Sequence, residues 1–176
     1  ELINEDIEKI IDEQKMVCVL DRIGIPWTLH YPRLAFLIGA LVTDGYIDKK
    51  QERIIFTQKE TEGKLDFINY VRSSFETVFE HDLSEGKLKV GGGLIRGKAM
   101  VGVASDFATG RKQTVEEIVS IYDNLQTWIL GLNLESTFNF LAGVIDGDGT
   151  WDPTYKVIDI FNSKENVIGA IVIACL

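Results

Sequence analysis

Two aspartates, Asp44 and Asp148, occupy the same place in two similar stretches of the chain. Residues 36–47 read FLIGALVTDGYI and residues 140–151 read FLAGVIDGDGTW. Each aspartate ends an apolar run of helical character, where the negative end of the helix macrodipole disfavours a carboxylate. A single Asp-Gly pair is most simply a turn after a core helix, but two matching copies favour a chemical role for the acids.

The chemistry open to this pair follows from its charge. If the two apolar helices pack in parallel, both carboxylates meet at one end and repel each other unless a proton or a cation neutralises them. Magnesium and similar divalent cations bind carboxylates together with water and phosphate oxygens. Such an ion promotes hydrolysis of a phosphodiester by activating water and stabilising the leaving oxygen. The pattern therefore predicts a metal-dependent phosphodiesterase.

Small residues support the parallel packing. They recur at every fourth position of both helices, as Ala35, Gly39 and Thr43 on the first and Asn139, Gly143 and Gly147 on the second. Glycine costs a helix about 1 kcal/mol relative to alanine, so a close approach of two backbones is the expected reason for it. We therefore expect Gly39 and Gly143 at a helix interface.

Hydrophobic periodicity and turn residues predict the elements that position these acids. Helices are expected at 2–24, 33–45, 64–79, 114–131, 138–149 and 166–176, and strands at 53–58, 87–90, 99–104 and 156–162. We expect Gly45 to cap the first apolar helix, and Thr114 with Glu117 to form a capping box. Both copies are followed by a strand and a helix, but the first continues through a glycine-rich hairpin and a further helix.

The two stretches resemble the motifs of the LAGLIDADG homing endonucleases, in the single-chain form that carries two motifs. The second copy matches the name at Leu141, Ala142, Gly143, Ile145, Asp146, Asp148 and Gly149, and the first keeps Leu37, Gly39, Asp44 and Gly45. The resemblance implies an α/β (α+β) fold, a pseudo-twofold pair of αββαββα-like halves with antiparallel saddle sheets in the DNA major groove and motif helices at the interface. It also implies that Asp44 and Asp148 bind Mg²⁺ or another divalent cation, and that both strands of a long duplex target are cut to leave short 3′ overhangs.

Further site residues are carried over from the same resemblance. The segments FTQK and FNSK offer polar residues that would position water and stabilise charge: Gln58, Lys59, Asn162 and Lys164. Basic residues on or beside the first-half strands are candidates for contacts with phosphates and base edges: Lys49, Lys50, Arg53, Lys87, Lys89, Arg96 and Lys98. Ordinary strand ends and surface solubilisation are the structural alternatives for these two sets.

Charge is unevenly distributed along the 176 residues. The net charge of −9 would not attract a polyanion, yet residues 49–112 carry 12 basic and 9 acidic side chains. Residues 113–176 carry 2 basic and 9 acidic side chains, so a basic face is expected in the first half alone.

The expected domains are an acidic helical extension at 1–33, a first half at 34–131 and a second half at 132–176. The second half stops before the hairpin that would complete its sheet. We therefore expect either a fragment, completed by a host protein or a second chain, or a degenerate protein, in an intein, intron or free-standing setting. The alternatives to a nuclease are a family member that binds DNA or RNA without cutting, as a maturase or regulator, and a purely structural module.

Several other classes of protein are disfavoured. The segment at 92–99, GGLIRGKA, lacks the Ser or Thr of a P-loop and precedes a strand-like run. His30 and His81 lack metal-ligand spacing, and Cys18 and Cys175 are expected to be buried thiols. No apolar run reaches the ~20 residues that cross a membrane. We expect no membrane partner, and a soluble protein of the cytoplasm of a microbial or phage-infected cell, or of an organelle.

Overall fold

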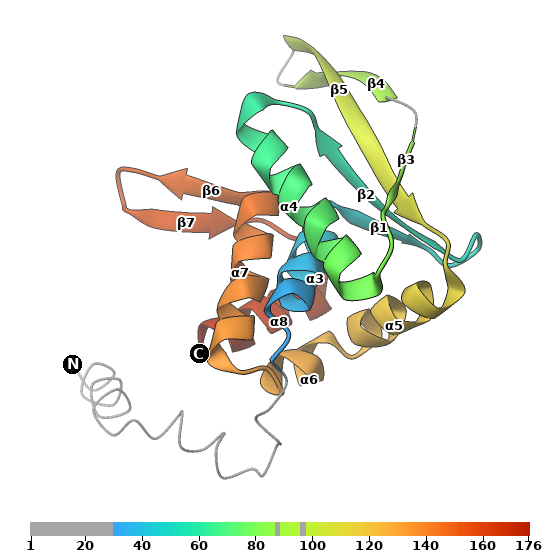
Figure 1. Cartoon of the computed structure of the whole chain (residues 1–176). Coiled ribbons are helices and arrows are strands. Elements are labelled where there is room, and N and C mark those ends of the chain that lie inside the picture. Colours follow the sequence, from blue (N-terminus) through green and yellow to red (C-terminus); the bar gives the residue numbers. More distant parts are fainter. Residues whose placement is uncertain (1–29, 87–88, 96–97) are drawn as a thin grey trace, which may run out of the picture.

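The computed structural model describes residues 30–86, 89–95 and 98–176, with the backbone alone at 89–95 and 98–101. Helices and antiparallel sheets make up the chain, which confirms the predicted α+β class (Figure 1). The first half contains α3 (Pro32–Asp44), β1 (Gly45–Asp48), β2 (Arg53–Lys59), α4 (Glu62–Phe79), β3 (Ser84–Glu85), β4 (Lys89–Ile95), β5 (Lys98–Thr109), α5 (Lys112–Asp123) and α6 (Leu125–Leu130). The second contains α7 (Leu134–Asp148), β6 (Gly149–Asp152), β7 (Val157–Ile160) and α8 (Glu165–Cys175). The helix predicted at 2–24 lies outside the described residues.

Helix α3 lies at the centre of the molecule beside α7 (Figure 1). Its residues from Leu34 to Val42 are all buried, because α4, α5 and α7 contact it. A helix that is apolar on every side requires such a surrounding. Pro32 occupies the first turn, where a missing backbone N–H leaves no helical hydrogen bond unmade. The first motif helix is therefore a core element that holds Asp44 at its C-terminal end.

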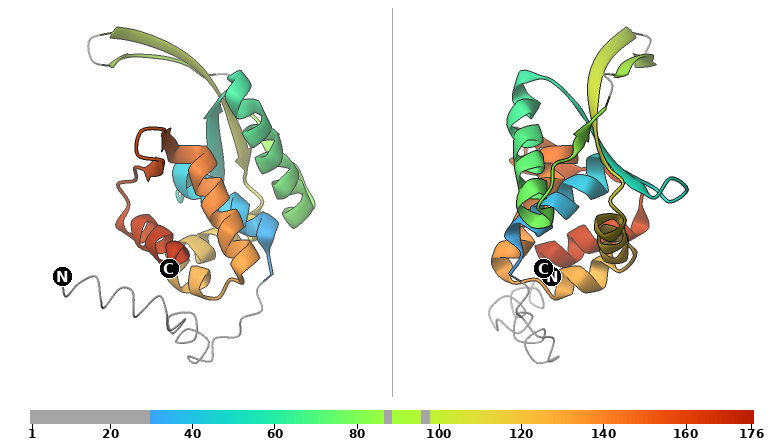
Figure 2. Two further views of the ribbon diagram at one scale, coloured as in Figure 1. Left: turned by 90° about the vertical axis from the view of Figure 1, so that its left-hand side faces the viewer. Right: turned by 45° about the vertical axis from the view of Figure 1, so that its right-hand side comes forward.

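The first-half sheet has the strand order β1-β2-β5-β3, and β4 pairs with β5. Every second side chain of β2 is buried beneath the helices, namely Ile54, Phe56 and Gln58. The strand register sets Phe56 opposite Phe107 of β5. Helix α4 covers this face through Phe67, whose ring centroid lies 5.6 Å from that of Phe56 in an edge-to-face arrangement. β4 and the adjoining part of β5 project beyond the helices as a curved hairpin (Figure 2).

The sequence repeat is also a structural repeat, with an offset of 104 residues (148 − 44). The strand registers match, with Gly45 opposite Phe56 in β1–β2 and Gly149 opposite Ile160 in β6–β7. In both turns an aspartate side chain accepts backbone N–H bonds and the residue before the second strand has positive φ: Asp48 and Glu52 (φ 48°), then Asp152 and Lys156 (φ 55°). The two hairpins extend from opposite sides of the α3–α7 pair (Figure 1).

The helix predicted at 114–131 is wrong at its start and in its middle. α5 begins at Lys112, so Thr114 and Glu117 lie inside the helix and form no capping box. Thr114 is buried, and its hydroxyl lies 3.0 Å from His81 Nε2. The helix is interrupted at Asn124 (φ −119°), whose side-chain amide donates to a carbonyl in the preceding turn, a local bond that competes with helical geometry.

Gly45 does not act as the left-handed cap that its position suggested. Its backbone is extended (φ −98°, ψ 151°) and begins β1. Glycine is required because a β-carbon at this position would collide with the carbonyl oxygen of Leu41. Gly149 stands in the same relation to Ile145, so each motif needs its final glycine for the sharp change from helix to strand.

Three smaller expectations can be compared with the structure. The segment that resembled a P-loop leads into strand β5 and not into a helix, so no helix N-terminus is available there for a phosphate. Cys175 is free and exposed at the end of α8 and not buried, while Cys18 lies outside the described residues. Across 30–86, 89–95 and 98–176, no helix is long and apolar enough to cross a membrane.

Candidate metal centre

Glycines define how α3 and α7 pack. Each contacts the backbone of the other helix at equivalent positions: Gly39 at Phe140 and Val144, and Gly143 at Phe36 and Ala40. A β-carbon at either glycine would collide with a carbonyl oxygen of the facing helix. The residue numbers at the contacts rise in the same direction along both helices. The offset of 104 also relates the residues that Gly39 contacts to those that Gly143 contacts. The helices are therefore parallel and related by a pseudo-twofold axis, as in an isologous interface.

The same packing brings Asp44 and Asp148 to one end of the helix pair. A β-carbon at Gly147 would lie 3.1 Å from Asp44 Oδ2, so the end of α7 leaves room for this carboxylate. Both acids are half-buried. Burial raises the pKa of Asp44 to about 6, and the neighbouring Asp148 carboxylate adds to the rise. Two acids that are partly removed from water and lie within each other's field favour a proton or a cation between them.

Gln58 reaches this pair from the end of β2. Its Nε2 donates to Asp44 Oδ2 (2.8 Å), and its Oε1 accepts from the backbone N–H of Lys59 (2.8 Å). The side chain is only 8% exposed, and the strand register places it opposite the buried Ser105 of β5. This hydrogen bond favours the charged carboxylate, opposes the rise in the pKa of Asp44, and orients the acid.

Lys64 is the residue near the acids that sequence reasoning missed. It lies in the first turn of α4, and its Nζ donates to the backbone carbonyl oxygens of Asp146 and Gly147, at 3.0 Å from the latter. Its charge opposes the rise that burial causes in the pKa of Asp44 and of Asp146. The only signal in the sequence was a lysine near a helix N-terminus, where the macrodipole disfavours a cation.

The donor atoms at this site suit a hard divalent cation. In the described part of the chain, no three His, Cys, Asp or Glu side chains form a group that could hold an ion. Asp44 and Asp148 offer two carboxylates, fewer than such a group of three. Magnesium commonly binds one or two carboxylates, with water and substrate phosphate completing its coordination shell. Structural zinc requires nitrogen or sulfur ligands, which are not found here.

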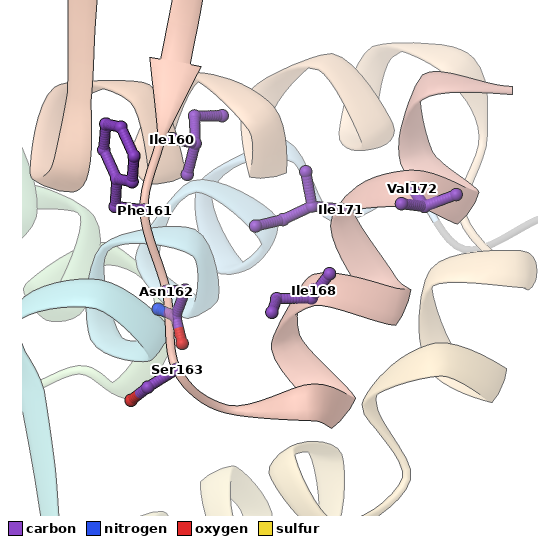
Figure 3. Close-up of a pocket in the computed structure, with 7 residues that line it drawn as sticks. All are labelled: Ile160, Phe161, Asn162, Ser163, Ile168, Ile171 and Val172. Atoms are coloured by element: carbon purple, nitrogen blue, oxygen red, sulfur yellow. The ribbon is translucent and has the colours of Figure 1, made fainter.

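The matching residues of the second half make other contacts. Asn162 is the counterpart of Gln58 under the offset of 104, but its Oδ1 accepts from the backbone N–H of Lys164 (2.9 Å), in the loop between β7 and α8 (Figure 3). The Lys164 ammonium lies 5.6 Å from the ring centroid of Tyr122 on α5. Neither side chain has a hydrogen bond or ion pair with Asp148 within the described residues.

The alignment of FNSK with FTQK explains part of this difference. The two segments are 105 residues apart by their phenylalanines, whereas the strand registers follow an offset of 104. Ser163 is therefore the structural counterpart of Lys59, and Lys164 is the counterpart of Glu60. The similarity of the two short segments therefore shifted the comparison for Lys164 by one position, in the loop that follows β7.

The second-half hairpin presents an open apolar surface. Ile158 is 45% exposed, whereas its first-half counterpart Ile54 is 1% exposed under the cover of the helices. Beside it, a groove of about 710 Å³ is lined by side chains of the β7 end and α8, including Ile160, Phe161 and Ile168 (Figure 3).

The basic candidates within the described residues lie on the first-half sheet and its turns, among them Lys59 of the proposed catalytic set. Lys59 is exposed on the face opposite Gln58, and its Cε would lie 3.3 Å from a β-carbon at Gly102 of β5. Lys49 and Lys50 are exposed in the turn after β1, where Lys49 Nζ lies 3.5 Å from Asp123 Oδ1.

Three further basic candidates begin strands of the first-half sheet. Arg53 Nε lies 4.0 Å from Asp48 Oδ2, at the start of β2. Lys89 begins β4 opposite Ala104, and Lys98 begins β5 opposite Ile95, at the two ends of the projecting hairpin, where the backbone alone is described. Lys87 and Arg96 lie outside the described residues.

Comparisons with known proteins place this chain beside part of a longer protein. No protein-family model matches the sequence. A probable phosphoenolpyruvate synthase of Methanocaldococcus jannaschii is 31% identical over 164 residues, which are 90% of this chain but 12% of that protein. Among solved structures, a variant of I-DmoI, in complex with its target DNA nicked in the coding strand and in the presence of manganese, has a TM-score of 0.48 and 14% identity. That similarity covers 80% of this chain and 73% of the other.

Proposed function

We propose that this chain is a metal-dependent endonuclease domain of the LAGLIDADG type, which hydrolyses both strands of a long, specific DNA duplex. The observation that carries the proposal is the parallel packing of α3 and α7, which holds Asp44 and Asp148 at one end of a pseudo-twofold axis. The halves at 34–131 and 132–176 would each present one acid to one strand, since pseudo-symmetric proteins match the local symmetry of duplex DNA.

The residues around the acids have distinct roles in this proposal. Asp44 and Asp148 would hold Mg²⁺ or another divalent cation, which when bound supplies Lewis-acid activation of water and phosphate. Gln58 holds the Asp44 carboxylate in one orientation and favours its charged form. Lys59 is exposed beside Gln58 and would contact a phosphate of the bound strand. Asn162 and Lys164 would reach the second acid only after the loop before α8 rearranges.

The DNA-binding face in this proposal is the first-half sheet with its projecting hairpin. A two-stranded ribbon fits the major groove, where base edges are distinguishable. The basic positions Lys49, Lys50, Arg53, Lys89 and Lys98 lie in this sheet or its turns. Lys87 and Arg96 complete the basic set proposed from the sequence.

A second candidate is a member of the same family that binds DNA or RNA without cutting, as a maturase or regulator. The second half favours it, because its β6–β7 hairpin exposes apolar side chains such as Trp151 and Ile158 and carries Lys156 as its one base. Such a surface contributes little to the binding of phosphates.

The setting of the domain is part of the proposal. Nearly the whole chain matches about an eighth of a protein named for a different reaction. This pattern supports a domain carried within a longer host polypeptide, such as an intein or another inserted element. The host, or a second chain, would then cover the open surface of the second half.

The test is cleavage of a randomised library of long DNA duplexes in the presence of Mg²⁺. The wild-type chain should cut both strands, and Asp44→Asn or Asp148→Asn should each lower the cleavage rate by more than about 100-fold, because a metal ligand is lost. Glu76→Gln, which removes an exposed carboxylate on α4, is the matched control and should leave the rate unchanged.

The outcomes separate the two candidates. Specific binding without cleavage by the folded wild-type chain would favour the binding protein. Absence of both binding and cleavage would contradict both candidates.

A further inference from the structure

The C-terminal end of α7 is held by a lysine from another helix. Helix α7 has no basic residue in its last turn, and its final carbonyl groups lack partners within the helix. Lys64 of α4 supplies the missing donor, because its Nζ binds the carbonyl oxygens of Asp146 and Gly147. A first-half side chain thereby fastens the end of the helix that carries Asp148.

The position of Lys64 is set by its own element. Its Nζ lies 5.2 Å from the ring centroid of Phe67, three residues later on α4. Phe67 is 6% exposed and packs edge-on against Phe36 of α3. The ring of this buried phenylalanine attracts the ammonium and limits the other conformations of the lysine side chain.

Lys64 also lies within the electrostatic field of the acids. Among the described groups that act on the Asp44 carboxylate, Lys64 is the cation, and it acts on Asp146 as well. The arrangement has no counterpart in the other half, because the residue equivalent to Lys64 under the offset of 104 is Ile168. One cation of the first half therefore acts on one acid of each half, Asp44 and Asp146.

We propose that Lys64 is a positioning residue of this site: it holds the Asp148-bearing end of α7 against the first half, and its ammonium is the counter-cation of the Asp44 carboxylate before a divalent cation binds. The part of this proposal that concerns the divalent cation rests on the proposed function. Loss of the ammonium leaves the acids with more repulsion, so that binding of a divalent cation relieves more of it.

The experiment compares the melting temperatures of wild type, Lys64→Met and Lys64→Arg, in EDTA and in saturating Mg²⁺. Lys64→Met should lower Tm in EDTA by roughly 2–4 °C, and Mg²⁺ should raise its Tm by more than it raises that of the wild type. Lys64→Arg should restore both values. Lys112→Met is the matched control, because Lys112 is an exposed lysine in the first turn of α5 and should show neither effect.

A double-mutant cycle with Asp44→Asn in EDTA separates the counter-cation role from simple helix capping. The Tm loss caused by Lys64→Met should shrink in the Asp44→Asn background, because the charge that Lys64 neutralises is gone. An equal loss in both backgrounds would overturn the proposal and leave Lys64 as a helix cap. If Mg²⁺ neither raises the wild-type Tm nor supports cleavage, the proposed function fails, and the cycle still decides the role of Lys64.

Discussion

At the scale of single residues, Asp44 makes the stability of the fold depend on pH. Its pKa rises from 3.8 to about 6 through burial and the neighbouring Asp148. Between these pH values the folded protein holds more protons than the unfolded chain, so the free energy of unfolding falls as pH rises. The contribution of Asp44 to the free energy of unfolding is fully present below pH 3.8, where the group is neutral in both states, and is lost as pH rises through about 6.

Asp44→Asn should remove this dependence, because an amide is neutral at every pH. In EDTA at pH 7, the free energy of unfolding should increase by about 1–2 kcal/mol, after allowance for solvent screening at a half-buried site. Urea denaturation of both proteins at a series of pH values measures this free energy of unfolding. Glu76→Gln is the control for loss of a carboxylate, and an unchanged pH profile for Asp44→Asn would contradict the assignment.

At the scale of elements, the contact between α3 and α7 depends on Gly39 and Gly143. Alanine at either position places a methyl group against a carbonyl oxygen of the facing helix. Gly39→Ala and Gly143→Ala should each lower the free energy of unfolding by roughly 1–3 kcal/mol, despite the better helix propensity of alanine. Separation of the helices should also lower any cleavage activity, because Asp44 and Asp148 would move apart.

Gly63→Ala is the matched control for this pair. Gly63 lies in the first turn of α4, and a β-carbon there has no atom within 4 Å. This variant should be unchanged or more stable by up to about 1 kcal/mol. Denaturant titration of all three variants provides the measurement, and equal effects at Gly39 and Gly63 would show that the helices do not approach closely.

At the scale of the whole molecule, the distribution of charge matters more than its sum. The net charge is −9, whereas the exposed first-half turn offers Lys49 and Lys50. If the first-half sheet binds DNA, the logarithm of the binding constant should fall linearly with the logarithm of salt concentration. Lys49→Ala and Lys50→Ala should each reduce the slope by about 1, because each removes one phosphate contact.

Arg33→Ala is the control for the salt experiment. Arg33 lies over the Tyr70 ring, near the N-terminal end of α3 and at the opposite end of that helix from Asp44. Fluorescence anisotropy with a long duplex at several salt concentrations measures the slopes. A flat response in the wild type would argue against DNA as the partner.

The sequence by itself determined the two motif helices, the repeat and the α+β class. These features are local: apolar runs, glycine spacing and turn residues act within a few turns of the chain, and two copies at one offset imply two similar units. The repeat extends even to the aspartates and positive-φ residues of both hairpin turns. The capping box at Thr114 was wrong, because α5 begins two residues earlier and the Thr114 hydroxyl lies 3.0 Å from His81 Nε2.

Only the tertiary structure decided which contacts the side chains around the acids make. Gln58, already a candidate from the sequence, donates to Asp44, whereas Lys64, which the sequence did not indicate, donates to carbonyl oxygens of α7 in the other half. Asn162 and Lys164 lie in the loop between β7 and α8, where Asn162 accepts from the backbone N–H of Lys164 and the Lys164 ammonium lies over the Tyr122 ring. Such contacts depend on distances between segments far apart in the chain, and residue types and spacing alone do not specify those distances.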